Sequence, residues 1–274
     1  VTDSKGTLRR QVGGILERRG FQLLELDFTD LLHSPWGYNP LRFIRYDMER
    51  ECWNEQDIIT VAAALVPVED KTQPFWEYAA RNLLEALIGY TLECLPAEEH
   101  DLTSVARLFS EAETGVLDEL MRELCTIDPG GFVAMRWRSL QTCRRADKMY
   151  GSILGILAQK ISNFSFSGAQ EMFINPNQVD FAAISHTPTA VFVRVSDNDF
   201  SLNNLTSLFY TQALQIFMAE ADSRPDGRLQ IPVRLYLDDF ANLNIPDIDK
   251  TISVIRSREI SVSIAIQSIT QLEG

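Results

Sequence analysis

Two adjacent carboxylates, Asp238 and Asp239, are the side chains of this sequence best suited to chemistry. They end a short apolar run, since residues 233–242 read Val-Arg-Leu-Tyr-Leu-Asp-Asp-Phe-Ala-Asn. The pattern indicates a buried parallel strand that delivers acids to its carboxyl end, where open α/β sheets bind ligands. In nucleotide hydrolases the first such acid holds Mg²⁺, usually through water, and the second orients or deprotonates the attacking water. Aspartate also favours helix N-termini, so a cap or a turn is the alternative.

The residues after the acids predict the elements that would complete such a site. Pro246 is placed to open a helix that runs toward Arg256 and Arg258. Residues 260–266, Ile-Ser-Val-Ser-Ile-Ala-Ile, then form a strand that ends in Gln267. A motor-type ATPase core needs this order, because one strand end holds the metal and the next places an amide that senses the γ-phosphate.

Residues 235–274 resemble the Walker B region and the following glutamine motif of the TraG/VirD4 family, the coupling proteins of type IV secretion. Three other stretches agree with this resemblance and occur in the same order. Val1-Thr-Asp-Ser-Lys-Gly6 resembles the family's Asp-Pro-Lys-Gly strand end, and residues 20–28 with Tyr38-Asn-Pro-Leu41 resemble its next strand and its Asn-Pro-Leu turn. Phe75-Trp76 resembles the start of its inserted all-α domain.

The resemblance implies a fold, a function and a set of roles. The fold is a RecA-like P-loop ATPase core, with a mostly parallel sheet, helices on both faces and an inserted all-α domain. The function is ATP-driven transfer of a relaxase–DNA complex through a membrane channel, with ATP and Mg²⁺ as cofactors. Asp238 would hold the metal through water, Asp239 would position the attacking water, and Gln267 would sense the γ-phosphate. Arg256 would reach the nucleotide of a neighbouring subunit, although Arg256 and Arg258 could instead complement a helix C-terminus.

The resemblance also implies partners and a location. They are DNA, relaxosome proteins, the components of the secretion channel and five further copies in a hexamer of the full-length protein. The location is the cytoplasmic side of a bacterial plasma membrane, with attachment through an N-terminal anchor.

The chain departs from the family pattern in two ways. Asp239 stands where the family often has glutamate, which is longer by a methylene. No Gly-x-x-x-x-Gly-Lys-Ser/Thr loop occurs in the sequence. We therefore expect a piece of a longer protein, whose P-loop and membrane anchor lie ahead of Val1, and we expect this piece alone to be inactive as an ATPase.

Composition narrows the class of protein. Hydrophobic residues make up 45% of the 274 residues, which suits a sizeable core, and no apolar run reaches the length of about 18 that spans a bilayer. The four cysteines are scattered, which argues against zinc and disulfide frameworks. The net charge of −13 opposes a surface coated in nucleic acid. Residues 76–130 are strongly acidic and residues 131–160 are basic. This predicts either an acidic docking face and a DNA-facing basic patch, or solvated helix faces that partly neutralise each other.

The pattern along the chain predicts three parts: residues 1–73 and 169–274 form the nucleotide-binding domain, and residues 74–168 form the all-α insertion. The first part and the last part alternate strand and helix, whereas residues 75–166 show only helical periodicity. Asn54 and Asp101 are placed as helix caps. A long helix is predicted over residues 134–164 with a possible interruption near Gly151.

Two alternatives stay open. The first is a related ATPase of the HerA/FtsK or VirB4 type, which would more often carry glutamate in place of Asp239. The second is a non-catalytic module that recognises substrate proteins through the all-α part.

Overall fold

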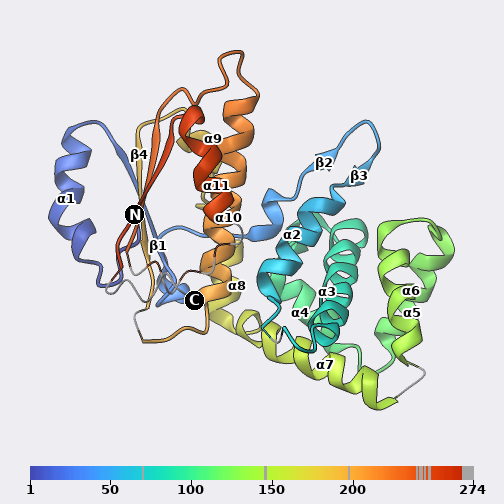
Figure 1. Cartoon of the computed structure of the whole chain (residues 1–274). Coiled ribbons are helices and arrows are strands. Elements are labelled where there is room, and N and C mark those ends of the chain that lie inside the picture. The colour runs from blue at the N-terminus through green and yellow to red at the C-terminus, as the bar shows by residue number, and fades with distance from the viewer. Residues whose placement is uncertain are drawn as a thin grey trace. The chain divides into compact units, whose positions relative to one another are not determined.

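The computed structural model describes residues 1–69, 71–144, 147–196, 198–238, 240, 243, 245 and 248–266. The chain forms two compact units (Figure 1). Unit 1 combines Val1–Tyr38 with Asn175–Gly274, and unit 2 is Asn39–Ile174. The boundaries predicted from the sequence, at residues 74 and 168, both lie inside unit 2. Unit 2 therefore extends beyond the predicted all-α insertion at both ends, by residues 39–73 and 169–174.

Unit 1 is built on parallel strands. They are β1 (Gln22–Asp27), β4 (Thr189–Arg194), β5 (Val233–Leu237) and β6 (Ile260–Ile264). Parallel β1 and β4 pair with Gln22 opposite Thr189, and parallel β5 and β6 pair with Val233 opposite Ile260. The first residues of the chain join the two pairs, because Thr2 forms a parallel bridge with Val193 and donates its N–H to the carbonyl of Tyr236 at 2.9 Å. The order across the unit is therefore β1, β4, residues 1–3, β5, β6.

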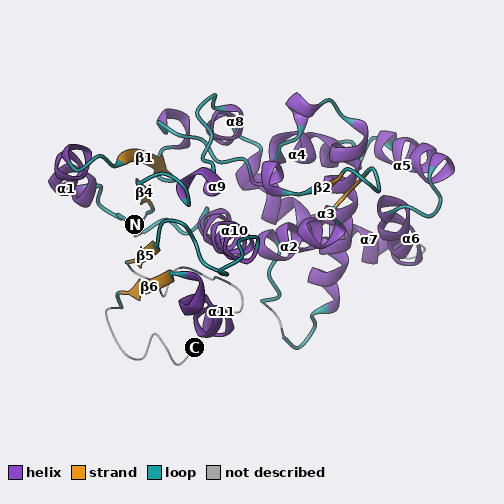
Figure 2. Ribbon diagram, turned by 90° about the horizontal axis from the view of Figure 1, so that it is seen from above, coloured by secondary structure: helices purple, strands orange, loops and turns teal. Residues whose placement is uncertain are grey.

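Helices lie on both sides of these strands. Figure 2 shows α1 (Thr7–Arg18) on one side and α9 (Phe181–Ile184), α10 (Asn203–Asp222) and α11 (Ile248–Ile255) on the other. An aromatic cluster fills the core on the α10 side, with ring centroids 5.0 Å apart for Phe181 and Phe209 and 5.1 Å apart for Tyr38 and Phe209. The Tyr38 hydroxyl donates to Gln212 at 2.6 Å, so this buried polar group is satisfied. The mixed fold with parallel strands confirms the coarse fold prediction.

Unit 2 is almost wholly helical. Its helices are α2 (Glu55–Leu65), α3 (Phe75–Cys94), α4 (Leu102–Ser110), α5 (Val116–Ile127), α6 (Phe132–Arg144), α7 (Asp147–Ile161) and α8 (Ser167–Ile174), with 3₁₀ turns η2 (Pro40–Phe43), η3 (Ala97–Glu99) and η4 (Ser162–Phe164). The described residues between 75 and 166 contain no strand. A two-residue antiparallel pair, β2 (Tyr46–Asp47) with β3 (Cys52–Trp53), lies ahead of α2 and was not predicted.

Helix ends follow the side chains that can cap them. The Asn54 side chain accepts the N–H of Asp57 at 3.0 Å, and Asp101 accepts that of Ser104 at 2.9 Å. Both caps confirm the sequence prediction, because a short polar side chain satisfies an N–H group that the first helical turn leaves unpaired. The predicted interruption near Gly151 is wrong, because Gly151 lies inside α7. The predicted long helix corresponds to α6 and α7, and residues 145 and 146 between them lie outside the described residues.

The acidic and basic stretches of unit 2 meet each other. Arg136 lies 2.7 Å from the buried carboxylate of Glu85, and Arg144 pairs with Asp118. The guanidinium of Arg144 also lies 4.7 Å from the ring centre of Tyr150. The basic stretch therefore neutralises part of the acidic one across the helices, as expected for helix faces that pack together.

Candidate functional site at the carboxyl ends of the strands

Asp238 follows β5 directly and is exposed. The chain beyond it stays beside the end of β6, because Ala265 donates its N–H to Leu237 at 2.9 Å and Phe240 donates to Ala265 at 3.2 Å. The start of this segment therefore lies beside Ala265, which directly follows β6 and stands two positions before residue 267 in the sequence. This arrangement follows from parallel pairing, which brings the carboxyl ends of neighbouring strands to one edge. Asp239 and Gln267 lie outside the described residues.

Two further acids follow strands at this edge, and both serve the fold. Asp27 ends β1, and its carboxylate lies 2.9 Å from Nη1 of Arg194, which ends β4. Asp3 accepts the N–H groups of Thr7 and Arg9 at 3.0 and 2.9 Å, so it caps the start of α1. Gly6, between Asp3 and α1, has φ of +62°, a conformation that favours glycine. The Asp-Ser-Lys-Gly segment thus turns the chain from the sheet edge into α1.

The sequence did not reveal the ion pair of Asp27 with Arg194. It shows that each residue ends an apolar run, but it does not show that the two runs pair with Asp27 opposite Arg194, which only the fold reveals. The pair holds the ends of β1 and β4 together at the edge that carries Asp238.

Arg256 lies at the other end of the strands from Asp238. It precedes β6, in the turn η6 (Arg256–Arg258), and β6 begins opposite Val233, the first residue of β5. The five residue-to-residue steps from Val233 to Asp238 span about 16 Å, so the side chains of Arg256 and Asp238 do not meet at one end of the sheet. Any role of Arg256 in catalysis would therefore require a nucleotide bound elsewhere than at the Asp238 of its own chain.

The neighbouring Arg258 has a structural role. Its Nε and Nη2 donate to the two carboxylate oxygens of Asp222 at 2.7 and 2.9 Å. Its Nη1 donates to the carbonyl of Val254 at 2.9 Å, near the end of α11. Arg258 thus donates a hydrogen bond to a carbonyl at the C-terminal end of α11. This is the alternative role that the sequence predicted for Arg256 and Arg258.

The described part of the chain contains no group of three His, Cys, Asp or Glu side chains placed to hold a metal ion together. Asp238 nevertheless suits one kind of cation. Mg²⁺ keeps several of its waters and binds proteins through one or two carboxylates. An exposed aspartate at the carboxyl edge of parallel strands is a suitable partner for such a hydrated ion. No helix in the described residues is long and apolar enough to cross a membrane.

The strands and the acid at their carboxyl edge define an α/β protein of the kind that binds ligands at a sheet edge. A family profile described as "Type IV secretory system Conjugative DNA transfer" matches residues 1–274. The chain therefore belongs to this family of conjugative DNA-transfer proteins.

Solved structures of a bacterial conjugative coupling protein share the fold. The chain resembles TrwBdeltaN70 in its trigonal form with sulphate, with a TM-score of 0.64 and 15% identity over 99% of this chain and 64% of that one. It resembles the plasmid coupling protein TrwB in complex with ADP and Mg²⁺ with a TM-score of 0.63 and 15% identity over 98% of this chain and 62% of that one. The chain thus spans less than two thirds of the length of these proteins. None of the curated proteins compared with the chain matches it.

Proposed function

We propose that this chain is part of a conjugative coupling ATPase with a RecA-like core and an inserted all-α domain. The observation that carries the proposal is the parallel pair of β5 and β6, with Asp238 at the carboxyl end of β5 and position 267 just beyond β6. Family membership supports the link to conjugative DNA transfer. The resemblance to a coupling protein solved with ADP and Mg²⁺ supports a nucleotide as the ligand of this fold.

The proposed roles follow the order of the residues along the strands. Asp238 holds Mg²⁺ through water, and the metal neutralises charge on the phosphate oxygens when bound. Asp239 orients the attacking water and accepts its proton. Gln267 donates or accepts a hydrogen bond at the terminal phosphate and so reports whether ATP or ADP is present. Arg256, which lies at the opposite end of β5 and β6, acts on a nucleotide held by an adjacent subunit.

We further propose that the full-length protein is a hexamer anchored in the inner membrane, and that it recruits relaxosome proteins and DNA to the secretion channel. Unit 2 is the candidate for recruitment, because it is compact and predominantly helical, and it includes the predicted insertion at residues 74–168.

A second candidate function rests on the same compactness. Unit 2 would recognise substrate proteins, and unit 1 would act only as its scaffold. The absence of a Gly-x-x-x-x-Gly-Lys-Ser/Thr loop in the sequence favours this reading for the chain by itself, because such a loop supplies the backbone N–H groups and the lysine that hold the phosphates.

A titration with Mg-ATP separates the two candidates. It would compare this chain with a version extended at its N-terminus by a segment that contains such a loop. We expect the chain alone to bind Mg-ATP weakly and to hydrolyse none, since each charge-assisted hydrogen bond lost costs about 1.5–3 kcal/mol. We expect the extended protein to bind and hydrolyse ATP. If the extended protein binds no nucleotide, only the second candidate function remains, in which unit 1 is a scaffold for unit 2. Micromolar binding of Mg-ATP by the chain alone would contradict the proposed site.

A further inference from the structure

The turn Asp3-Ser-Lys-Gly6 leaves the strands of unit 1 beside Asp238. Thr2 donates its N–H to the carbonyl of Tyr236 at 2.9 Å. In a parallel pair the donor stands opposite the residue that follows its acceptor, as it does where β1 pairs with β4. By this register Asp3 stands opposite Asp238, and neighbouring strands lie about 4.8 Å apart. Lys5, two residues after Asp3, therefore lies at the same carboxyl edge as Asp238.

The backbone of this turn is held in place. The carbonyl of Asp3 accepts the N–H of Gly6 at 3.2 Å, and α1 begins directly after Gly6. A Cβ atom on Gly6 would lie 3.7 Å from Nε of Arg194, so the turn packs against the side chain that ends β4. Only the side chain of Lys5 has to become ordered when a ligand binds to it, which keeps the entropic cost of binding low.

The ammonium group of Lys5 has no acidic partner within the described part of the chain. Lys5 is exposed, and no described carboxylate pairs with it. The nearest acid along the sequence is Asp3, whose two carboxylate oxygens accept backbone N–H groups at the start of α1. By contrast, the guanidinium of Arg194 at the same edge pairs with Asp27 at 2.9 Å. Lys5 can therefore bind an anion without giving up an ion pair.

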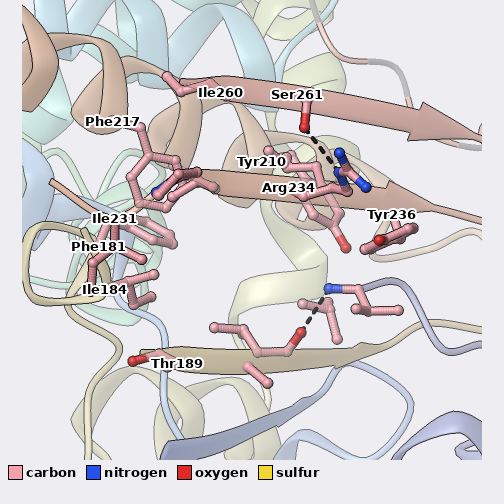
Figure 3. A pocket seen from close by; sticks show the side chains of 18 of the residues that line it. Phe181, Ile184, Thr189, Tyr210, Phe217, Ile231, Arg234, Tyr236, Ile260 and Ser261 are labelled. Atoms are coloured by element: carbon pink, nitrogen blue, oxygen red, sulfur yellow. Dashed lines mark hydrogen bonds between the residues drawn. The ribbon is translucent and has the colours of Figure 1, made fainter. Parts of the chain in front are cut away.

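The arginines of β5 and of the turn before β6 lie farther from Asp238. Nε of Arg234 donates to the hydroxyl of Ser261 on β6 at 3.2 Å, and Figure 3 shows this bond with Tyr236 beyond it on β5. Arg234 precedes Asp238 by four residues, which separates them by about 13 Å along the strand. Arg256 lies at the opposite end of the strands. Lys5 thus combines a place beside Asp238 with an amine that no described acid engages.

A phosphate ligand at this edge needs such a cation. Two adjacent acids, Asp238 and Asp239, follow β5 in the sequence, and their charge opposes that of a triphosphate. Enzymes of phosphoryl transfer place a lysine or an arginine on the phosphate oxygens beside the metal ion. The ammonium of a lysine is a compact charge on a flexible stem, so it can follow an oxygen atom that moves during the reaction.

We propose that Lys5 binds a phosphate oxygen of the nucleotide held at the carboxyl end of β5. This role presupposes the nucleotide site proposed above and adds to it a cation from the neighbouring strand end. Lys5 donates an N–H group to the oxygen and offsets the charge of the two acids. The phosphate groups of DNA offer the same chemistry, and the experiment therefore compares the two sources.

Amine labelling of the full-length protein tests this contact without any substitution. A small amine-reactive reagent modifies exposed lysines, and mass spectrometry measures the rate at each one. We expect saturating Mg-ATP to slow the modification of Lys5 about tenfold or more, because the bound amine is withdrawn from the reagent. Lys71, an exposed lysine of unit 2, is the control and should react at an unchanged rate. A mixed-sequence DNA oligonucleotide should not protect Lys5.

Substitutions give a second measurement, the dissociation constant for Mg-ATP. Lys5→Met should raise it about tenfold or more, because one charge-assisted hydrogen bond is lost. Lys5→Arg, which keeps the charge, should retain most of the affinity, and Lys71→Met should change nothing.

The outcomes separate this role from the nucleotide site itself. A protein that binds Mg-ATP while Lys5 reacts as fast as before would overturn the role of Lys5 and leave the site standing. Protection of Lys5 by DNA and not by Mg-ATP would overturn it as well. A full-length protein that binds no nucleotide would overturn both the role and the site.

Discussion

Three aspartates follow strands at the carboxyl edge of unit 1, and their surroundings separate their roles. Asp27 is matched by Arg194, and Asp3 accepts two backbone N–H groups at the start of α1. Asp238 is exposed at the end of β5 and is followed by a second acid. Asp27 and Asp3 are thus accounted for by the fold, and the proposed metal role falls to Asp238, whose place at the end of β5 is open to solvent.

The role of Asp239 is tested in a protein extended to include a phosphate-binding loop. Asp239→Asn should lower ATP turnover by about 100-fold or more, because an amide cannot accept the proton of the attacking water. Nucleotide binding should persist, since Asp238 is intact. Asp226→Asn, an exposed change in the loop after α10, is the control and should leave turnover unchanged. Unchanged turnover in Asp239→Asn would remove Asp239 from the mechanism.

A second prediction at the residue scale concerns Glu93, near the end of α3. Desolvation, with added repulsion from Asp128 and Glu55, raises the pKa of Glu93 from 4.5 to about 7. The folded state therefore holds a proton that the unfolded state has released, and stability falls as the pH rises from about 4.5 to about 7. Glu93→Gln removes this penalty. Because the carboxyl group is partly open to solvent, we expect a gain of at most about 1 kcal/mol.

Urea unfolding at pH 8 and at pH 4.5 measures this effect. The gain of Glu93→Gln should be present at pH 8 and much smaller at pH 4.5, where the folded state and about half of the unfolded state hold the proton. Glu113→Gln, at an exposed position of the same unit, should change stability little at either pH. A gain of equal size at both pH values would show that charge is not its cause.

At the scale of elements, α3 and α6 approach each other through a glycine. A Cβ atom on Gly89 would lie 2.6 Å from Cγ2 of Val133, so even alanine is too large there. Gly151, in α7, has no atom within 4 Å of such a Cβ. The two glycines are both helical, yet one is required by packing and the other only lowers helix propensity.

This difference gives a matched pair of substitutions. Gly89→Ala should destabilise the protein by about 1–3 kcal/mol, because overpacking outweighs the better helix propensity of alanine. Gly151→Ala should stabilise it by about 0.5–1 kcal/mol. Chemical denaturation monitored by circular dichroism measures both. A stable Gly89→Ala protein would mean that α3 and α6 separate more easily than their packing indicates.

The same elements show what the sequence could and could not predict. Caps depend on neighbouring residues, so Asn54 and Asp101 were recognised. The periodicity of the strands gave β4 and β6, because their apolar runs are local features. The interruption predicted near Gly151 was wrong, because glycine is tolerated where a helix faces solvent. The short pairing of β2 with β3 was missed because two residues carry no periodicity.

The candidate site was predictable in part for the same reason. Asp238 is marked by the apolar run before it, and the structure places it at the end of β5. The pairing of Asp27 with Arg194 depends on register between distant segments. No local pattern encodes register, so this pair emerges only from the fold.

At the scale of the whole molecule, the chain leaves unit 1 and returns to it at one place. Gly37 donates its N–H to Asn177 at 2.8 Å and accepts that of Val179 at 3.0 Å. The side chain of Asn175 donates to the carbonyl of Ser34 at 3.1 Å. The two crossings are thus held side by side by bonds within unit 1. Such an arrangement allows the residues between them to be removed without displacing either crossing.

Two excisions compare the boundaries seen in the contacts with those predicted from the sequence. Replacing residues 40–173 by a short Gly/Ser linker should leave unit 1 folded, because its aromatic cluster and both strand pairs lie outside the deletion. Replacing residues 74–168 instead keeps α2 but removes α3, on which α2 packs. The buried side chains of Ile58, Val61 and Leu65 would then lose α3 as a packing partner, so we expect this second protein to aggregate or to unfold at a lower temperature.

Size-exclusion chromatography and calorimetry on the two proteins show which boundary separates independently folding units. A monomeric, cooperatively unfolding 40–173 excision, beside an aggregating 74–168 excision, would place the domain boundary at Tyr38 and Asn175. Residues 39–174 expressed alone should then also unfold cooperatively, since they contain α2, α3 and the Arg136–Glu85 pair together. The reverse result would place the boundary where helical periodicity begins, and η2, β2, β3 and α2 would belong to the same domain as the strands that present Asp238.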